Sequence, residues 1–303
     1  MPALSAIICT VNRPDLIAGA VRSVLGGDLQ DIELVVVDQS RDSSTRDALA
    51  EFAADHRLHY LHSPRVGLSA AYNTGIAAAS SYLLAFTDDD CIAAPDWASS
   101  VLYAFEKHTD VDLVYGQVIG PSEAIGEGVI PTLEFAERRK LSRGDGFRVY
   151  GMGANFAARR RLFDSMGGFD EVLGGGGPLR SSQDFDLQFR AYRSGAVCLL
   201  EPLVRVTHYG LREHDRWPAT LTAYGVGDGG FYMKHVRCGD PLAAWMFVRK
   251  LTGESARVVL KPLLRRKHSR SYLVGMLRGM AGSFRYPVDR RRRTYLQTPA
   301  QES

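Results

Sequence analysis

The first half of the chain alternates apolar runs with segments of helical periodicity. Four runs rich in β-branched or aliphatic residues have the length and flanking loops of strands, and they lie at residues 6–9, 32–37, 58–61 and 82–86. Segments whose apolar residues recur every three or four positions lie between them, at residues 17–25, 45–54 and 68–79. This alternation predicts an α/β fold with a mostly parallel central sheet flanked by helices.

The second half is less regular. Strands are predicted at residues 111–118 and 152–157, and helices at residues 159–166 and 183–193. Residues 197–206 have the pattern of a strand that is interrupted at Pro202. Three glycine-rich stretches predict mobile loops, at residues 167–168, 174–177 and 225–230. We expect a body of residues 1–239 followed by a helical extension of residues 240–303.

The composition is that of an ordinary globular protein, with 45% hydrophobic and 23% charged residues in 303. Four scattered cysteines lack the spacing of a metal or redox site, which predicts buried thiols in a reducing compartment; they are Cys9, Cys91, Cys198 and Cys238. The chain begins directly with a strand pattern, and no segment approaches the ~18 uninterrupted apolar residues of a membrane span. We therefore expect a cytoplasmic protein.

The charge is unevenly distributed along the chain. Between Arg249 and Arg293 there are 14 Lys and Arg residues but only two acidic residues, Glu254 and Asp289. The rest of the chain is therefore net acidic, and the basic extension predicts an anionic partner. Nucleic acid is not expected, because the basic residues are not interleaved with a stacking surface of aromatic residues.

Residues 243–264 of the extension have the periodicity of an amphipathic helix. Basic and acidic residues fall within an arc of roughly 140°, namely Arg249, Lys250, Glu254, Arg257 and Lys261. Apolar residues lie largely on the other side, namely Leu251, Val258, Val259 and Leu263. Two interpretations remain open. The helix docks on an anionic membrane surface at the inner face of the plasma membrane, or it packs on the body with a solvated basic face.

Three consecutive aspartates, Asp88, Asp89 and Asp90, follow the strand at residues 82–86. Adjacent carboxylates repel one another unless they are solvated or neutralised by a cation, and their oxygens suit Mg²⁺ or Mn²⁺. Ligands of open parallel sheets bind beyond the carboxyl ends of the strands, which is where these residues are predicted to lie. The alternative is an acidic turn before the next helix, for which Asp96 already offers a cap.

Other polar residues also follow predicted strands or begin predicted helices. Asp38 ends the second strand, where it contacts a base or ribose or forms a turn. Thr10, Asn12 and Arg13 follow the first strand, and they cap the next helix, face a nucleotide, or do both. Two further candidates are Asp184, at a helix start where the helix dipole favours a carboxylate, and His208, at a strand end where a histidine is more often structural.

Together these motifs resemble family-2 inverting glycosyltransferases of the GT-A fold, from about Ser5 to Gly210. Residues 7–14 and 35–38 look like the opening strand with its nucleotide-contacting loop and the strand whose aspartate contacts the base. Residues 67–76 resemble the donor-side helix motif, with Tyr72 in place of its usual arginine. The resemblance implies a nucleotide-sugar half, residues 1–118, and an acceptor half, residues 119–239. It implies donor contacts from Thr10, Asn12, Arg13, Asp38, Arg65, Asn73, Asp88 and Asp89.

The same resemblance implies the metal, acceptor and base residues. Asp88 and Asp90 match the ends of the family's Asp-x-Asp metal motif, and His208 is placed to complete the metal shell. Residues 151–160 and 167–171 are similar to the acceptor-side segment, which implies acceptor contacts from Gly153, Asn155, Asp170 and Gln183. Gln183-Asp184 occupies the place of a Glu-Asp pair whose aspartate is the general base. Residues 129–150 and 174–177 are expected to shape the acceptor site.

The implied function is Mg²⁺- or Mn²⁺-dependent transfer of a sugar from a nucleotide-sugar donor to a hydroxyl of a glycan or lipid-linked acceptor. Configuration inverts because there is one displacement. Two alternatives remain. A non-catalytic carbohydrate-binding or scaffold protein is compatible with the departures at Tyr72 and Gln183, and a nucleotidyltransferase or phosphatase is a different use of an acidic strand end. Residues 10–15 lack the glycine that a nucleotidyltransferase phosphate loop needs.

Overall fold

A computed structural model describes residues 1–123, 126–263 and 270–297, except for the side chains of residues 259–263. These residues form two compact units. Unit 1 comprises residues 1–66, 70–168 and 187–212, and unit 2 comprises residues 67–69, 169–186 and 213–303. The units are interleaved in sequence, unlike the division at residues 239 and 240 that the sequence suggests.

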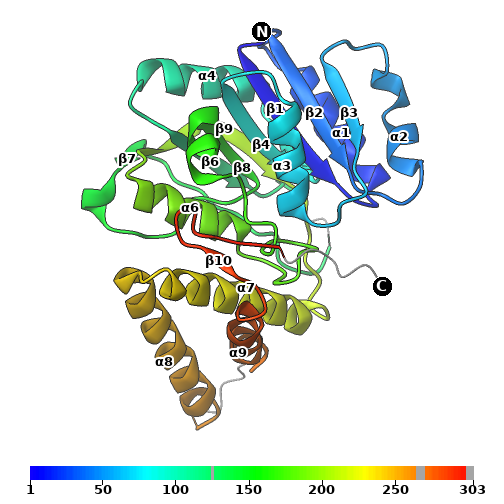
Figure 1. The fold of residues 1–303 in the computed structure, drawn as a ribbon. Coiled ribbons are helices and arrows are strands. Elements are labelled where there is room, and N and C mark those ends of the chain that lie inside the picture. Colours follow the sequence, from blue (N-terminus) through cyan, green and yellow to red (C-terminus); the bar gives the residue numbers. More distant parts are fainter. Residues whose placement is uncertain (124–125, 264–269, 298–303) are drawn as a thin grey trace. The chain divides into compact units, whose positions relative to one another are not determined.

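Unit 1 is built on a nine-stranded mixed sheet with the order β3-β2-β1-β4-β8-β6-β9-β5, and β7 pairs with β9 (Figure 1). Its strands are β1 Leu4–Thr10, β2 Ile32–Asp38, β3 Leu58–His62, β4 Leu83–Asp88, β5 Cys91–Ala93, β6 Leu113–Ile119, β7 Arg139–Leu141, β8 Asn155–Arg159 and β9 Cys198–His208. The first four are parallel, whereas β8 runs antiparallel to β4 and β6. The expected α/β fold is confirmed, and its parallel half is the half that the alternating pattern predicted.

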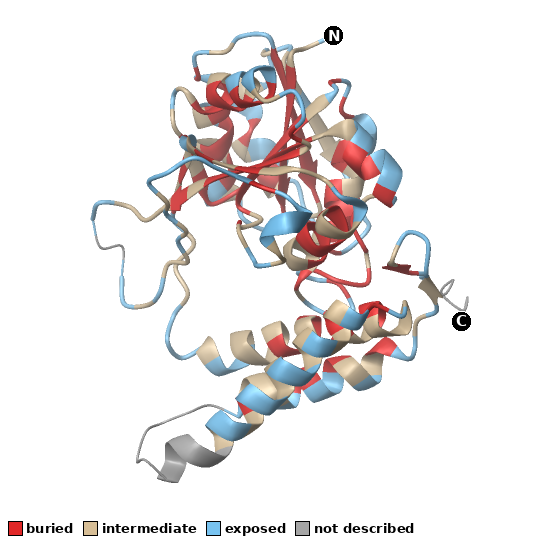
Figure 2. Ribbon diagram, turned by 90° about the vertical axis from the view of Figure 1, so that its left-hand side faces the viewer, coloured by how far each residue is buried: buried red, intermediate tan, exposed pale blue. Residues whose placement is uncertain are grey.

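Helices pack on this sheet and bury its side chains on both faces. They are α1 Pro14–Leu25, α2 Ser44–Ala48, α3 Leu68–Ala78, α4 Trp97–Lys107, α5 Arg160–Met166 and α6 Gln183–Ser194. Every residue of β1 and β2 is buried, which is why their sequences are continuous apolar runs (Figure 2). The predicted helix over residues 45–54 is shorter, because α2 gives way to a 3-10 turn at Ala50–Phe52.

The strand predicted to be interrupted at Pro202 forms one element, β9, of eleven residues. Its pairing with β6 is nevertheless interrupted there, because Tyr115 pairs with Leu200 and Gln117 pairs with Arg205, so Pro202 lies in a stretch of β9 that has no paired residue on β6. A proline lacks a backbone N–H, so the ladder accommodates it where the pairing is already offset. This continuity carries His208 to the end of β9, opposite Cys91 of β5.

Unit 2 contains three long helices, α7 Trp217–Arg237, α8 Pro241–Leu263 and α9 Ser271–Ser283, and a hairpin of β10 Val288–Asp289 and β11 Thr294–Tyr295. The prediction of a loop at residues 225–230 is wrong, because these residues lie inside α7. A Cβ on Gly229 would lie 2.1 Å from the Met276 carbonyl oxygen, and one on Gly279 would lie 1.9 Å from that of Val226. The glycines therefore let α7 and α9 approach backbone to backbone, and helix packing outweighs their low helix propensity.

Candidate active site

The aspartate cluster lies where β4 turns into β5, at the carboxyl end of the parallel strands. Asp89 and Asp90 are almost completely buried, and the side chains of Thr10, at the end of β1, and of Arg13, which follows it, contact them. The Thr10 hydroxyl donates to Asp89 Oδ2 at 2.7 Å, and Arg13 Nη1 lies 2.8 Å from Asp89 Oδ1 and 3.0 Å from Asp90 Oδ2. The parallel pairing of β1 and β4 thus brings residues 76 to 79 positions apart into one site.

Asp88 is the carboxylate whose protonation is most perturbed. Burial, followed by the negative charges of Asp90 and Asp89, raises the pKa of Asp88 to about 7. The Tyr72 hydroxyl donates to Asp88 Oδ1 at 3.2 Å, and its ring meets Phe86 edge to face with centroids 5.4 Å apart. Tyr72 therefore brings a neutral donor to the position where the resemblance implies an arginine.

His208 and Asp90 face each other across the pairing of β5 and β9. His208 Nε2 lies 3.4 Å from Asp90 Oδ1, while His208 Nδ1 lies 3.0 Å from the Pro131 carbonyl oxygen. A carbonyl oxygen can accept a hydrogen bond but cannot donate one, so Nδ1 carries the proton. When the ring is neutral, Nε2 therefore presents its lone pair to Asp90. Burial alone would lower the pKa of His208, but the adjacent Asp90 carboxylate and its negative charge raise it.

These atoms fit a divalent cation. Asp90 Oδ1 is buried and makes no hydrogen bond among the described residues. When His208 is neutral, Asp90 Oδ1 and His208 Nε2 are two acceptors that face each other. A proton or a cation must therefore lie between them. A Cβ on Gly210 would lie 2.6 Å from both Asp90 Oδ2 and His208 Nε2. A glycine here therefore keeps the space beside both ligand atoms open.

The ligand set differs in one member from the expected one. Ligand atoms of Asp90, Cys91 and His208 all lie within 4.8 Å of one another, whereas the expected set held Asp88 in place of Cys91. Burial, followed by the charges of Asp88 and Asp90, raises the pKa of the Cys91 thiol, which keeps it protonated and a poor ligand for a hard cation. Asp90 and His208 are common to both sets.

The loops that follow β1 and β2 are tied to each other. Asp38 is fully buried, and its two oxygens accept the Ser40 N–H at 2.8 Å and the Tyr60 hydroxyl at 2.7 Å. The N–H of Asn12, a residue with a φ of 54°, donates to the Ser40 hydroxyl at 2.7 Å. Asp38 thus forms a turn, which is one of the two roles that the sequence suggests for it. Through Ser40 it also shapes the loop after β1 that contains Asn12.

Two other expected donor residues lie in unit 1. Arg65 is exposed, and its backbone carbonyl accepts a hydrogen bond from the Gln39 side chain. Asn73 is half-buried on α3, and a Cβ on Gly168 would lie 2.6 Å from its Oδ1.

Asn155, expected to contact the acceptor, has a structural role instead. Its side chain is fully buried, its Oδ1 accepts the Trp97 indole N–H at 2.9 Å, and its Nδ2 donates to the carbonyls of Gln117 and Val204. These bonds join β8, β6, β9 and α4, so Asn155 has no group left for a substrate. Gly153, two residues earlier, is half-buried just before β8.

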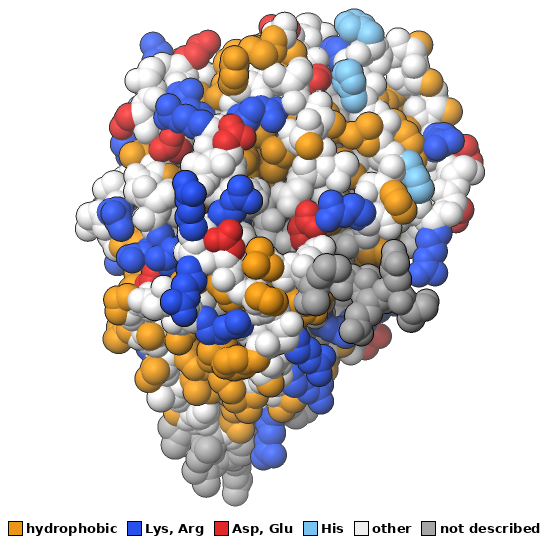
Figure 3. Space-filling model, in the orientation of Figure 1, with side chains coloured by type: hydrophobic (Ala, Val, Ile, Leu, Met, Phe, Trp, Pro, Cys, Tyr) orange, Lys and Arg blue, Asp and Glu red, His pale blue; other side chains and the backbone are white. Residues whose placement is uncertain are grey.

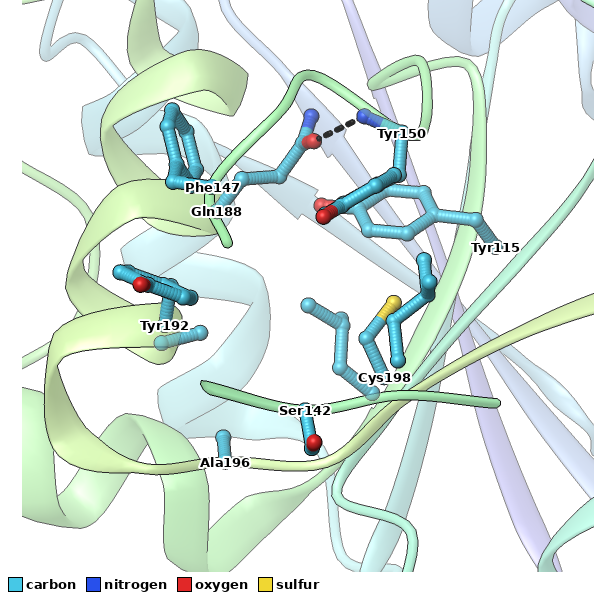
Figure 4. Close-up of a pocket in the computed structure, with 11 residues that line it drawn as sticks. Tyr115, Ser142, Phe147, Tyr150, Gln188, Tyr192, Ala196 and Cys198 are labelled. Atoms are coloured by element: carbon cyan, nitrogen blue, oxygen red, sulfur yellow. Dashed lines mark hydrogen bonds between the residues drawn. The ribbon is translucent and has the colours of Figure 1, made fainter. Parts of the chain in front are cut away.

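The segment expected to shape the acceptor site lines part of a small pocket (Figure 4). Four aromatic side chains line the wall, and the Gln188 side-chain oxygen Oε1 accepts a hydrogen bond from the Tyr150 N–H at 2.9 Å. The labelled lining residues are Tyr115, Ser142, Phe147, Tyr150, Gln188, Tyr192, Ala196 and Cys198.

In unit 2, Gln183 and Asp184 begin α6. Asp184 is half-buried, and its Oδ1 lies 2.8 Å from the Phe185 N–H. Asp170 is completely buried, and it accepts hydrogen bonds from Lys234 Nζ at 2.6 Å and the Tyr295 N–H at 2.8 Å on one oxygen and from the Val172 N–H at 3.1 Å on the other. Asp170 therefore anchors unit 2, and its buried carboxylate is not exposed to a substrate.

Sequence reasoning missed the cation at the centre of this anchor. Lys234 Nζ is fully buried and lies 2.6 Å from Asp170 and 2.6 Å from Asp186, and His235 Nε2 lies 2.9 Å from the same Asp186 oxygen. A lysine in the last turns of an amphipathic helix carries no signal of burial, so only the fold reveals it.

Comparison with known proteins agrees with this fold. The model of the family "Glycosyl transferase family 2" matches residues 5–167. The pre-mycofactocin glycosyltransferase of Mycobacterium tuberculosis is 28% identical over 228 residues, which cover 71% of this chain and 47% of the relative. The validoxylamine A glucosyltransferase of Streptomyces hygroscopicus is 32% identical over 124 residues, which cover 40% of this chain and 29% of the relative. The chain thus spans about half or less of the length of these relatives.

Solved structures share the architecture at low identity. Residues 1–349 of TarS from Staphylococcus aureus superpose with a TM-score of 0.58 at 18% identity, covering 75% of this chain and 65% of TarS. The mannosyltransferase PcManGT from Pyrobaculum calidifontis, solved with GDP-Man and Mn²⁺, has a TM-score of 0.59 at 17% identity, covering 93% of this chain and 86% of PcManGT. With a family model that spans more than half of its residues, the chain belongs to glycosyltransferase family 2 and has the GT-A fold.

Proposed function

We propose that this glycosyltransferase moves a sugar, with inversion, from a nucleoside-diphosphate sugar to a hydroxyl of a glycan or lipid-linked acceptor in a metal-dependent reaction. The observation that carries the proposal is the pair formed by Asp90 and His208, a buried carboxylate oxygen without a hydrogen bond that faces an imidazole nitrogen at 3.4 Å. It lies at the carboxyl end of the sheet, where α/β folds bind their ligands.

Mg²⁺ or Mn²⁺ is the proposed cofactor, held by Asp90 and His208 with Asp88 beside them. Such a cation neutralises the charge that develops on a departing nucleoside diphosphate. Oxygen and imidazole ligands suit this class of metal, and the structural neighbour PcManGT was solved with Mn²⁺.

The donor diphosphate also needs cationic side chains, because Tyr72 supplies none. Arg13 has 49% of its side chain exposed while one nitrogen holds Asp89 and Asp90, so the rest of its guanidinium is available to an anion. Arg65 is the second proposed phosphate contact, with Thr10, Asn12, Asn73 and Asp89 as further donor residues. We do not extend this set to Asp38, whose oxygens are engaged by Ser40 and Tyr60.

Asp184 is the proposed general base. Its carboxylate takes the proton of the acceptor hydroxyl, the hydroxyl oxygen bonds to the anomeric carbon, and the bond from that carbon to the diphosphate oxygen breaks. The single displacement inverts the configuration. In favour of this role, Asp184 is half-buried, so part of its carboxylate is accessible, and its sequence neighbour Gln183 is neutral.

The first prediction is that the protein hydrolyses one nucleotide sugar slowly in the presence of Mn²⁺ and without an acceptor. Incubation with a panel of nucleotide sugars, followed by chromatography of the released nucleoside diphosphate, measures this and identifies the donor. A nucleotidyltransferase would instead release pyrophosphate from a nucleoside triphosphate and a sugar phosphate. A carbohydrate-binding protein would bind without release.

Asp90→Asn and His208→Ala provide the variants for this assay. Each should weaken Mn²⁺ binding by about 10–100-fold and lower hydrolysis in parallel. The matched control is Asp110→Asn, a carboxylate 60% exposed that pairs with Lys140, and it should behave as the unaltered protein. Release that does not depend on metal, or that is equal in the Asp90→Asn variant, would argue against the site.

An anionic membrane surface is the second proposed partner. None of the described helices is long and apolar enough to cross a membrane. On α8, however, Trp245 and Val248 are 58% and 57% exposed, and the Arg249 guanidinium lies 5.4 Å from the Trp245 ring. Figure 3 shows hydrophobic side chains gathered among Lys and Arg over the helices of unit 2. Exposed tryptophan beside arginine suits the headgroup region of an anionic bilayer.

The predicted basic face of α8 is correct only in part. Glu254 belongs to the predicted charged arc, yet it is almost fully buried and pairs with Arg257 at 2.5 Å and Lys250 at 3.7 Å. The exposed side of α8 therefore mixes apolar and basic residues. Lys261, Val259 and Leu263 belong to the predicted arcs, and their side chains lie outside the described residues.

We expect the protein to sediment with liposomes that contain phosphatidylglycerol at low ionic strength, and to be released as salt screens the attraction. Trp245→Ser combined with Val248→Ser should weaken this binding about tenfold. Tyr82→Ser, which removes a 70% exposed aromatic residue from unit 1, is the control. No binding by the unaltered chain, or equal loss in the control, would refute membrane contact through α8.

A further inference from the structure

Two residues that lead into α6 have an unusual backbone. Arg180 and Ser182 have φ values of 66° and 71°, in the left-handed region that residues with a Cβ rarely adopt. The carbonyl oxygen of Ser182 accepts the Asp186 N–H at 2.9 Å, and this bond belongs to the first turn of α6. The conformation of Ser182 therefore decides the direction in which the turn that carries Asp184 begins.

A partly buried chain of hydrogen bonds holds Ser182 in this conformation. The Ser182 hydroxyl donates to Asp228 Oδ1 at 2.7 Å, and the Tyr272 hydroxyl of α9 donates to Asp228 Oδ2. Lys250 of α8 completes the surroundings, since its Nζ lies 4.7 Å from the centre of the Tyr272 ring. All three helices of unit 2 thus act on Ser182 through one carboxylate.

The neighbouring residue is clamped from the same side. The Ser181 hydroxyl donates to the Ala223 carbonyl oxygen at 3.0 Å, and a Cβ on Gly227 would lie only 2.1 Å from the Ser181 hydroxyl oxygen. Gly227 therefore lets α7 press directly against residues 181–182. Strained conformations persist only where the surroundings impose them, and they concentrate at functional sites.

We propose that Asp228 is a positioning residue for the glycosyl transfer, which holds Ser182 in its left-handed conformation and thereby aims the Asp184 carboxylate at the acceptor hydroxyl. This inference rests on the proposed role of Asp184. It assigns a purpose to the only described acidic residue within α7, which the reaction itself does not use. The geometry also explains why α7 has a glycine on either side of Asp228, at Gly227 and Gly229.

Replacement of Ser182 by alanine and by glycine separates positioning from other roles. Both variants lose the hydroxyl, but only glycine adopts a positive φ without strain. Ser182→Ala should lower kcat about tenfold, the rate equivalent of the strain of one left-handed residue, with the KM for the donor unchanged. Ser182→Gly should stay within about threefold of the unaltered protein.

A second pair of variants tests Asp228 itself. Asp228→Ala should lower kcat about tenfold in the natural background and have little further effect in the Ser182→Gly background, because glycine no longer needs the restraint. A merely structural role would lower the melting temperature equally in both backgrounds and leave kcat per folded molecule unchanged. If Asp228→Ala does not fold, the comparison of Ser182→Ala with Ser182→Gly still decides the matter.

The outcomes distinguish this inference from the proposed function. Equal kcat values for Ser182→Ala and Ser182→Gly, measured alongside an inactive Asp184→Asn variant, would overturn the positioning role and leave the base in place. An active Asp184→Asn variant would overturn the base and the inference with it. A loss confined to Ser182→Ala, with donor KM and nucleoside diphosphate affinity unchanged, is the expected result.

Discussion

Replacing Asp184 by asparagine is expected to lower sugar transfer by about 10²–10⁴-fold, the usual contribution of a general base. The amide has nearly the size of the carboxylate and still accepts a hydrogen bond from the Phe185 N–H, which lies 2.8 Å from Asp184 Oδ1. It does not take up a proton at neutral pH. The loss should therefore fall on kcat, while the affinity for the nucleoside diphosphate stays within about threefold.

The measurement is a transfer assay with the donor identified by hydrolysis, combined with calorimetric titration of the nucleoside diphosphate. Asp215→Asn is the matched control, because it is the same substitution made at an exposed aspartate of the same unit. Asp215→Asn should turn over normally. Unaltered turnover by the Asp184→Asn variant would reject the assignment of the base.

The largest expected effect on stability comes from Lys234→Ala. Lys234 Nζ lies 2.6 Å from Asp170 and 2.6 Å from Asp186, and all three side chains are fully buried. Removal of the ammonium leaves two carboxylates without their cation in the interior, which costs about 3–5 kcal/mol of the free energy of unfolding. Thermal unfolding followed by circular dichroism should show a melting temperature several degrees lower.

The matched control is Lys140→Ala, which breaks an exposed pair with Asp110 at 2.9 Å and should cost no more than about 1 kcal/mol. Equal melting temperatures for both variants would mean that the buried cluster contributes little.

The sequence was sufficient for the parallel half of the fold. β1 and β2 are buried on both faces, so their residues form uninterrupted apolar runs, and the helices between them have one buried face. The same local logic places Asp88 to Asp90 at the end of β4, because the buried apolar run of the strand stops where the carboxylates begin. Sequence therefore located the acidic cluster, and the resemblance added His208 as its partner.

Local patterns failed where a distant segment decides the outcome. Gly225 to Gly230 resemble a loop by propensity, yet they lie in α7 because α9 packs against Gly225 and Gly229. Cys91 looked like an ordinary buried thiol, and the pairing of β5 with β9 brings it beside Asp90 and His208. In each case the determining contact is more than forty residues away along the chain.

The roles of polar residues divide in the same way. Sequence alone identified the types of residue that bind a cation and a nucleotide and the strand ends on which they lie, because hydrophobic periodicity and strand boundaries are local properties. Only the tertiary structure decided that Asn155 and Asp170 are engaged in the interior, that Lys234 is buried between two carboxylates, and that Asp228 holds Ser182. Burial and hydrogen-bond partners depend on which elements meet, and that is a property of the folded chain as a whole.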